Sequence, residues 1–458
     1  MKFITPCFLM SFSFFANIAF ANEDFASWAE ALKQDAMRVG ITEKTVTETI
    51  YHVELLPNVI NLDRSQPEFV SPFLDYYQRH VDVTKIRRGQ EMLIKHKELL
   101  NKVEAQYGVP QTMLVAFWGM ETNYGRFQGN VDTLSALVTL AYDGRRSIFF
   151  RNQLFDAMRM IDAGHAEIED FEGSWAGAFG HMQFMPSTFM TYAVDGDGDG
   201  KIDLVNSVPD AFSSAANYLS QVGWRKGEPA MLEVQLPEDF AWQNAQLNLR
   251  KPLEEWARLG VISAHISPSK VGGSFAQVRS PAKKLISKKI NSKLRSINYN
   301  VEVKNDIPVN SKSETSSALP IVAGHAAIVL PQGWRGPAFM VFDNFDAVMD
   351  WNRSVNYALS VVQLAKRLSG EPPIRGGQFA EIGALSFQQM KALQVELNAQ
   401  GFDAGDADGF PGVRTQEAVR AFQTSQRLPA DGYASPNIFN YLKLISKKVH
   451  PALTLQEQ

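Results

Sequence analysis

Two stretches of the chain carry most of the information about its fold and function: Trp118-Gly-Met-Glu-Thr-Asn-Tyr-Gly125 and, about sixty residues later, Gly180-His-Met-Gln-Phe-Met-Pro-Ser187. Pro110 suits the first turn of a helix, because its missing N–H would have no intrahelical partner there. An apolar run follows, and Asn123 is a helix stop signal. The sequence therefore predicts a helix whose last turn contains Glu121.

Glu121 is the first candidate for chemistry. In a helix it shares one face with Phe117 and Trp118, four and three residues earlier. Apolar rings deprive a carboxylate of hydration, so we expect the pKa of Glu121 to rise, as a general acid near neutral pH requires. The alternative is an ordinary surface or capping glutamate. The flanking motif favours the acid.

In five ordered segments the chain resembles the lytic murein transglycosylases of the membrane-bound lytic transglycosylase B type. The segments are the Glu121 stretch, Arg145-Arg146, Ser174-Trp-Ala-Gly-Ala178 running into Gln183-Phe-Met-Pro186, the acidic loop at Asp195, and Trp351-Asn352 with Tyr357. They are spread from about Trp28 to Arg367. The resemblance implies a mainly α, lysozyme-like catalytic domain with an EF-hand-like loop.

The resemblance also implies a reaction. Glycosidic cleavage ordinarily needs two carboxylates, yet the family resemblance supplies only Glu121, as sole acid and base. In this family the substrate's N-acetyl group is thought to stabilise positive charge while its C6 hydroxyl attacks the anomeric carbon. Such intramolecular attack reaches effective molarities of roughly 10^5 M or more. Cleavage of the MurNAc-GlcNAc β-1,4 bond of peptidoglycan would then leave a 1,6-anhydro-muramyl end, with no catalytic cofactor.

Two other functions stay open. A muramidase would hydrolyse the same bond but needs a second carboxylate or base. A non-catalytic peptidoglycan-binding scaffold would not need an acid at Glu121.

The resemblance assigns further residues to substrate binding. They are Ser174, Gln183, Phe184, Trp351, Asn352, Tyr357, Arg145 and Arg146. Gln183 could instead tie two loops together. Trp351 stands where some members have tyrosine, so we expect it to stack on sugar at most. The two arginines either reach a peptide-stem carboxylate or pair with nearby acids.

The acidic loop predicts a calcium site. In EF-hand order the ligands would be Asp195, Asp197, Asp199, the carbonyl of Lys201, Asp203 and, at position 12, Asn206. Asn206 replaces the usual bidentate glutamate, so we expect weak, structural Ca²⁺ binding, with a Kd of about 10^-4 to 10^-3 M. The alternative is an acidic turn without metal.

The N-terminus indicates export. Residues 1–21 contain Lys2, an apolar run and the ending Ala19-Phe-Ala21, which is typical of a secretory signal peptide. A retained membrane anchor is the alternative, although Pro6 and several polar residues make a poor spanning helix. We expect a periplasmic protein with no stable membrane insertion after cleavage.

Composition narrows the function further. The only cysteine, Cys7, lies in the predicted signal peptide and lacks the small residues of a lipoprotein signal, so the mature chain has no thiol. Without Lys2 it carries 44 basic and 49 acidic residues, a net charge of −5 that does not suggest nucleic-acid binding. The eight histidines include no pair at i, i+4 for zinc.

A chain of 458 residues with 45% apolar content implies two or three domains. Helical spacing runs from 25 to about 147 and recurs at 147–164, 209–223, 252–259 and 351–368, with a strand at 339–342. Residues 22–370 would form the catalytic domain. Within them, 263–319 is a basic insertion, expected as a flexible solvated loop. The alternative is a basic arm that attracts the anionic wall or a membrane surface.

The C-terminal part predicts a separate module. Pro and Gly mark 371–384 as a linker. In 385–446 a helical stripe begins at Phe387, and the glycine loop Asp408-Gly-Phe-Pro-Gly412 follows. This segment resembles the three-helix peptidoglycan-binding domain of many wall hydrolases. The resemblance implies peptidoglycan as the partner and leaves other wall enzymes open.

Overall fold

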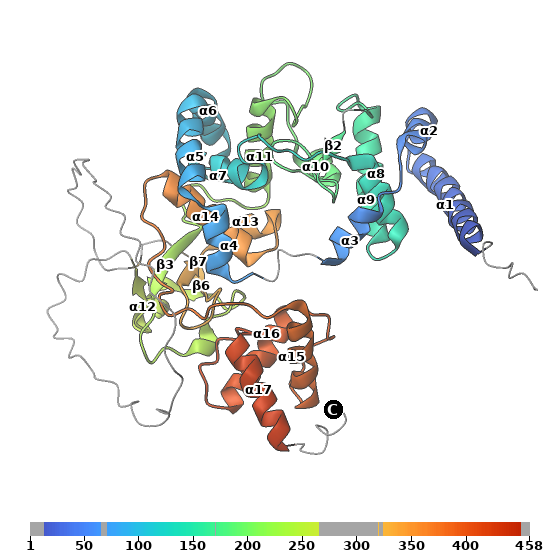
Figure 1. Cartoon of the computed structure of the whole chain (residues 1–458). Helices are drawn as coiled ribbons and strands as arrows, with labels where there is room; N and C mark the ends of the chain where they lie inside the picture. The colour runs from blue at the N-terminus through green and yellow to red at the C-terminus, as the bar shows by residue number, and fades with distance from the viewer. Residues whose placement is uncertain (1–12, 66–70, 170, 265–318, 320–323, 450–458) are drawn as a thin grey trace, which may run out of the picture.

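The protein is mainly helical, and the computed structural model describes residues 13–65, 71–169, 171–264, 319 and 324–449 (Figure 1). The helices of the larger domain are α1 (Ser13–Arg38), α2 (Glu43–His52), α3 (Pro57–Ser65), α4 (Phe73–His80), α5 (Val83–Lys95), α6 (Lys97–Tyr107), α7 (Gln111–Thr122), α8 (Thr133–Asp143), α9 (Ser147–Asp162), α10 (Pro186–Tyr192), α11 (Val208–Gln221), α12 (Leu253–Arg258), α13 (Asp343–Trp351) and α14 (Val355–Leu368). The mainly α class is confirmed. No helix within these described ranges is long and apolar enough to cross a membrane.

Two predictions fall partly outside the described residues. Residues 1–12 of the predicted signal peptide, with Cys7, lie outside them, and the remainder forms the start of α1. Residues 265–318 of the basic insertion also lie outside. Both assignments stay predictions.

Helix α7 is the predicted helix that carries Glu121. It packs against α5, α6, α11 and α14, and its Leu114 and Phe117 are fully buried. Pro110 is the residue before the helix rather than a first-turn residue, because its backbone is extended. Asn123 ends the helix in the left-handed conformation, with φ 52°, as its stop signal predicts.

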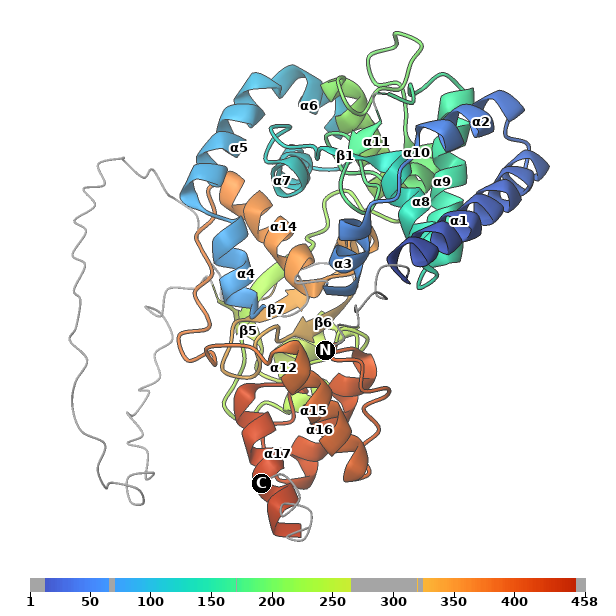
Figure 2. The ribbon, with the colours of Figure 1, turned by 45° about the vertical axis from the view of Figure 1, so that its right-hand side comes forward.

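A five-stranded antiparallel sheet lies below α7 and α14 in Figures 1 and 2. Its order is β4 (Lys251–Pro252), β6 (His325–Val329), β7 (Ala338–Val341), β3 (Met231–Gln235) and β5 (Ile262–Ser263); a separate pair joins β1 (Val131–Asp132) and β2 (Glu172–Gly173). Strand β7 confirms the strand predicted at 339–342, one residue earlier. Alternate side chains of β7 enter two cores, Phe339 the main helical core and Met340 a smaller one around Trp256.

The helix predicted over 351–368 is in fact two elements. Trp351 is the last residue of α13, and the chain is extended at Asn352 before α14 begins at Val355. Ser354 starts α14, because its hydroxyl oxygen accepts the backbone N–H of Tyr357. This break places Trp351 and Tyr357 on different helices.

The C-terminal module has the three predicted helices, α15 (Phe387–Ala399), α16 (Val413–Ser425) and α17 (Pro436–Val449). The glycine loop is held by the buried amide of Gln394, which donates to Asp408 Oδ1 at 2.9 Å and accepts the N–H of Gly409 at 2.8 Å. The preceding linker is irregular, as predicted. It is nevertheless docked, since Glu233 of β3 accepts the backbone N–H groups of Arg375 and Gly376.

Candidate active site

Glu121 lies where the ends of three helices meet. It occupies the last turn of α7, while Trp351 ends α13 and Tyr357 lies in the first turn of α14. The Trp351 indole N–H donates to Glu121 Oε1 at 2.9 Å, and the Tyr357 hydroxyl donates to the same oxygen. Two donors therefore converge on one carboxylate oxygen.

Trp351 is held for this contact by an aromatic cage. Its ring centroid lies 4.4 Å from that of Phe117, 5.4 Å from Phe184 and 5.1 Å from Tyr218. The expectation that Trp351 does no more than stack on sugar is wrong, because its N–H bonds the candidate acid. Trp351 lacks the hydroxyl of the tyrosine that some family members have at this position, and its indole N–H supplies a donor instead.

Two residues of the site were missed in the sequence. Tyr218, in the cage, has its pKa raised to about 12 by burial and by nearby Asp350 and Tyr192. Lys85 of α5 donates from Nζ to the carbonyl oxygen of Gly119 at 3.0 Å; burial lowers its pKa, and the negative charges of Asp82 and Glu121 oppose that shift. Neither residue has a distinguishing motif, because each sits in an ordinary helical pattern.

The loop before α10 is shaped by its own polar side chains. Ser174 Oγ accepts backbone N–H groups of Ala176 and Ala178, at 3.3 and 3.1 Å. Gln183, with φ 49°, donates from Nε2 to the carbonyl oxygens of Gln128 and Gly180, at 2.8 and 3.1 Å. Gln183 thus joins two loops, which is the alternative role that the sequence left open for it. Its role toward substrate, like that of Ser174, stays a prediction.

Four other residues predicted to bind substrate need correction or restatement. Phe184 is only 2% exposed and packs against Trp351 within the cage, so it offers a sugar almost no surface. Arg145 and Arg146 both pair with buried Asp63 of α3, Arg145 at 2.5 Å, which is the ion-pair alternative. Asn352 accepts the Ser354 N–H at 3.1 Å and remains a predicted substrate contact.

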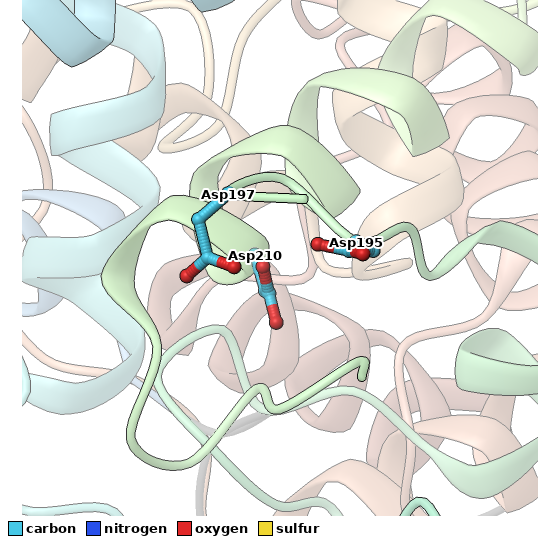
Figure 3. Close-up of side chains that lie close together, drawn as sticks. All are labelled: Asp195, Asp197 and Asp210. Atoms are coloured by element: carbon cyan, nitrogen blue, oxygen red, sulfur yellow. The ribbon is translucent and has the colours of Figure 1, made fainter. Parts of the chain in front are cut away.

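The acidic loop brings together a different carboxylate set from the predicted one. Asp195, Asp197 and Asp210 have carboxylate oxygens within 4.8 Å of one another (Figure 3). Within the described chain, Asp199 and Asp203 do not belong to this group.

Asp210, in the first turn of α11, was missed because Ser207-x-x-Asp210 also fits a helix cap, and the Ser207 hydroxyl does accept its N–H. The predicted position-12 ligand, Asn206, precedes the helix, and its amide donates to Asp203 at 3.0 Å.

These carboxylates fit a hard divalent cation. Asp210 is 1% exposed, and the loop wraps around it through the N–H groups of Gly196 and Asp203, at 2.8 and 2.7 Å. Backbone N–H groups, chiefly those of Gly200 and Gly198, lower the pKa of Asp195 and keep it charged. Three carboxylates so close repel one another, and oxygen ligands are those calcium prefers.

The fold and the site define a two-domain protein: a helical domain with one carboxylate held by an indole and a phenol, and a small three-helix module. The family comparison agrees. The transglycosylase SLT domain profile matches residues 24–292 and 274–366, and the peptidoglycan binding domain profile matches 388–442. The chain belongs to the transglycosylase SLT domain family, which confirms the resemblance to lytic murein transglycosylases.

Three relatives are similar to the chain to different extents. SltB3 from Pseudomonas aeruginosa, solved in complex with NAG-NAM-pentapeptide, is 37% identical with a TM-score of 0.76, over 91% of this chain and 99% of that one. Membrane-bound lytic murein transglycosylase B of Escherichia coli (strain K12) is 32% identical over 199 residues, 41% of this chain and 55% of the relative. The match thus spans about half of that curated relative. Slt35 of Escherichia coli, solved with calcium, shares the fold at 23% identity and a TM-score of 0.54, over 74% of this chain and 92% of that one.

Proposed function

We propose that the protein is a lytic transglycosylase that cleaves the MurNAc-GlcNAc β-1,4 bond of peptidoglycan with Glu121 as its sole acid and base. The observation that carries this proposal is the convergence of Trp351 and Tyr357 on Glu121 Oε1. Both are neutral donors, and neither can act as the second carboxylate of a glycoside hydrolase. Family membership and the peptidoglycan-binding module supply the substrate class.

In this proposal the two carboxylate oxygens have different tasks. Oε1 already accepts two hydrogen bonds, so the transferable proton belongs on Oε2. In the first step Oε2–H protonates the glycosidic oxygen, the C1–O bond breaks, and the leaving sugar takes the electron pair. The resulting carboxylate is stabilised at Oε1, since hydrogen bonds to a charged acceptor are the stronger ones.

The second step closes the ring. The C6 hydroxyl oxygen bonds to C1 while its proton passes to Glu121 Oε2, which restores the acid. The product is a 1,6-anhydro-muramyl end, and no water is consumed. A cofactor has no role in these two steps.

The experiment is mass spectrometry of purified sacculi digested with the protein. Muropeptides one water lighter than the hydrolysed form are expected. Full-mass reducing ends would instead indicate a muramidase, and Asp350, exposed and adjacent to Trp351, would be the carboxylate to test as Asp350→Asn. Glu121→Gln should abolish release but keep sacculus binding. Binding without release by the wild-type protein would leave the scaffold alternative.

We also propose a structural calcium ion at Asp195, Asp197 and Asp210, with the carbonyl of Lys201 as a further ligand. The support is the closeness of three carboxylates around a loop that wraps Asp210. Calcium should raise the melting temperature, and chelation should reverse the change. An unchanged melting temperature would contradict the site.

Finally, we propose export to the periplasm, where peptidoglycan is accessible. The support is the signal-like composition of residues 1–21. Protein recovered from cells should begin at Asn22. An intact Lys2 in the exported protein would favour the anchor alternative.

A further inference from the structure

His181 connects the helix that carries Glu121 to the loop that carries Asp195 and Asp197. It lies in the motif that begins at Gly180 and is only 9% exposed. Its backbone N–H donates to the carbonyl oxygen of Leu204 at 2.8 Å, and Leu204 lies in the loop before α11. Its backbone carbonyl accepts the hydroxyl of Thr122, the last residue of α7, at 2.9 Å.

The imidazole makes the third connection. The Trp118 indole N–H donates to His181 Nδ1 at 3.1 Å, in a buried setting. An indole nitrogen can only donate, so Nδ1 must be unprotonated and the ring proton must lie on Nε2. Burial also lowers the pKa of His181, which keeps the ring neutral.

Two glycines, Gly125 and Gly180, allow close approaches of the backbone around His181. A Cβ on Gly125 would lie 2.4 Å from His181 Cε1, and a Cβ on Gly180 would lie 2.5 Å from the carbonyl oxygen of Leu204. Both glycines have positive φ, 73° in each case. The chain therefore passes close to the ring at Gly125 and close to the backbone of Leu204 at Gly180, and neither position leaves room for a side chain.

We propose that His181 is a positioning residue that fixes the last turn of α7 and, through it, the direction of the Glu121 carboxylate. Trp118 and Thr122 flank Glu121 in sequence, three residues before it and one after it. His181 binds both of them, while Trp351 and Tyr357 hold the carboxylate itself. Loss of the ring contact leaves α7 helical but frees its last turn to shift. A shift of about 1 Å at a catalytic group can cost a hundredfold in rate. This inference rests on the proposed role of Glu121.

The test compares His181→Leu, which removes the acceptor, with His181→Asn, whose amide oxygen can replace Nδ1. His181→Leu should lower kcat on a soluble muramyl glycan about ten- to a hundredfold, with KM and sacculus binding within about twofold. His181→Asn should recover most of the loss. The control is His325→Asn, at an exposed histidine of β6.

A double-mutant cycle isolates the ring contact. Trp118→Phe removes the donor of the same hydrogen bond. The total kcat loss of the double variant Trp118→Phe/His181→Leu should therefore be much smaller than the product of the two single losses. Additive losses, an unchanged kcat in His181→Leu, or equal losses in the Leu and Asn variants would overturn the proposal.

A second readout does not depend on activity. With ¹⁵N-labelled tryptophan, the Trp118 indole signal is identified by its loss in Trp118→Phe. The signal should shift and exchange faster with solvent in His181→Leu, and return toward its position in His181→Asn. An unshifted signal would overturn the link by itself. An inactive wild-type protein with the expected indole shifts would refute the proposed function and also the positioning role of His181 in catalysis, but not the hydrogen bond.

Discussion

The Tyr357→Phe substitution tests the division of labour at Glu121 directly. It removes one oxygen from a side chain that is 6% exposed and leaves the ring in place. Glu121 Oε1 then keeps the Trp351 indole N–H, at 2.9 Å. The fold should persist, because α14 keeps its Ser354 cap.

The magnitude follows from the charge that Glu121 gains in the first step. A hydrogen bond to a charged acceptor contributes about 1.5–3 kcal/mol, and one to a neutral acceptor about 0.5–1.5 kcal/mol. Only the difference, about 1–2 kcal/mol, acts on the barrier, because the hydroxyl also bonds the neutral acid. We therefore expect kcat to fall roughly 5- to 30-fold, with KM nearly unchanged.

The assay is the initial rate of anhydro-muropeptide release at several concentrations of a soluble glycan. Trp351→Phe removes the other donor, keeps a ring in the aromatic cage and should behave similarly. Tyr51→Phe, at a tyrosine that is 84% exposed, is the control. A kcat within twofold of wild type for Tyr357→Phe, alongside an inactive Glu121→Gln, would refute the reasoning.

Three further predictions concern stability. Burial alone would raise the pKa of Asp63, but the hydrogen bonds and charges of Arg145 and Arg146 outweigh it, so the pKa is lowered in the folded protein. The ion pairs therefore stabilise the fold at neutral pH, and this stabilisation is lost as pH falls through the pKa of Asp63 in the folded state. Asp63→Asn should thus lower the unfolding free energy by about 2–4 kcal/mol at pH 7, and urea unfolding near pH 3.5 should show a smaller difference between the variant and the wild type. An equal difference at the two pH values would count against the ion pairs. Asp210→Asn should abolish the calcium-induced rise in melting temperature seen by calorimetry, whereas Glu238→Gln should retain it. Gln394→Leu should destabilise the C-terminal module by about 1–3 kcal/mol, because the loop groups of Asp408 and Gly409 lose their partner; retained sacculus binding with an unchanged melting profile would contradict this.

The local pattern was enough to predict several elements. The apolar run before Glu121, the stop at Asn123 and the stripe beginning at Phe387 each correspond to an observed helix or helix end. These features depend on hydrophobic spacing and on backbone preferences, which nearby residues largely determine. Boundaries were less certain, as the break between α13 and α14 shows.

The partners of the site residues could not be predicted in the same way. Asp210 entered the carboxylate group because the first turn of α11 faces the loop, and Asp63 was paired with Arg145 across 82 positions. Such contacts depend on helix packing, which no short window of sequence contains.

The sequence by itself predicted the helix that carries Glu121, because that helix depends on residue types at short spacing. Its resemblance to known families further implied the fold class, the role of Glu121 as the acid and the three-helix module. Only the tertiary structure decided that Trp351 and Tyr357 share one oxygen of Glu121, and that His181 bonds Trp118 and Thr122 of the same helix. The physical reason is that a hydrogen bond requires an approach of about 3 Å. Residues 230 and 236 positions from Glu121 reach that distance only when three helix ends have packed together.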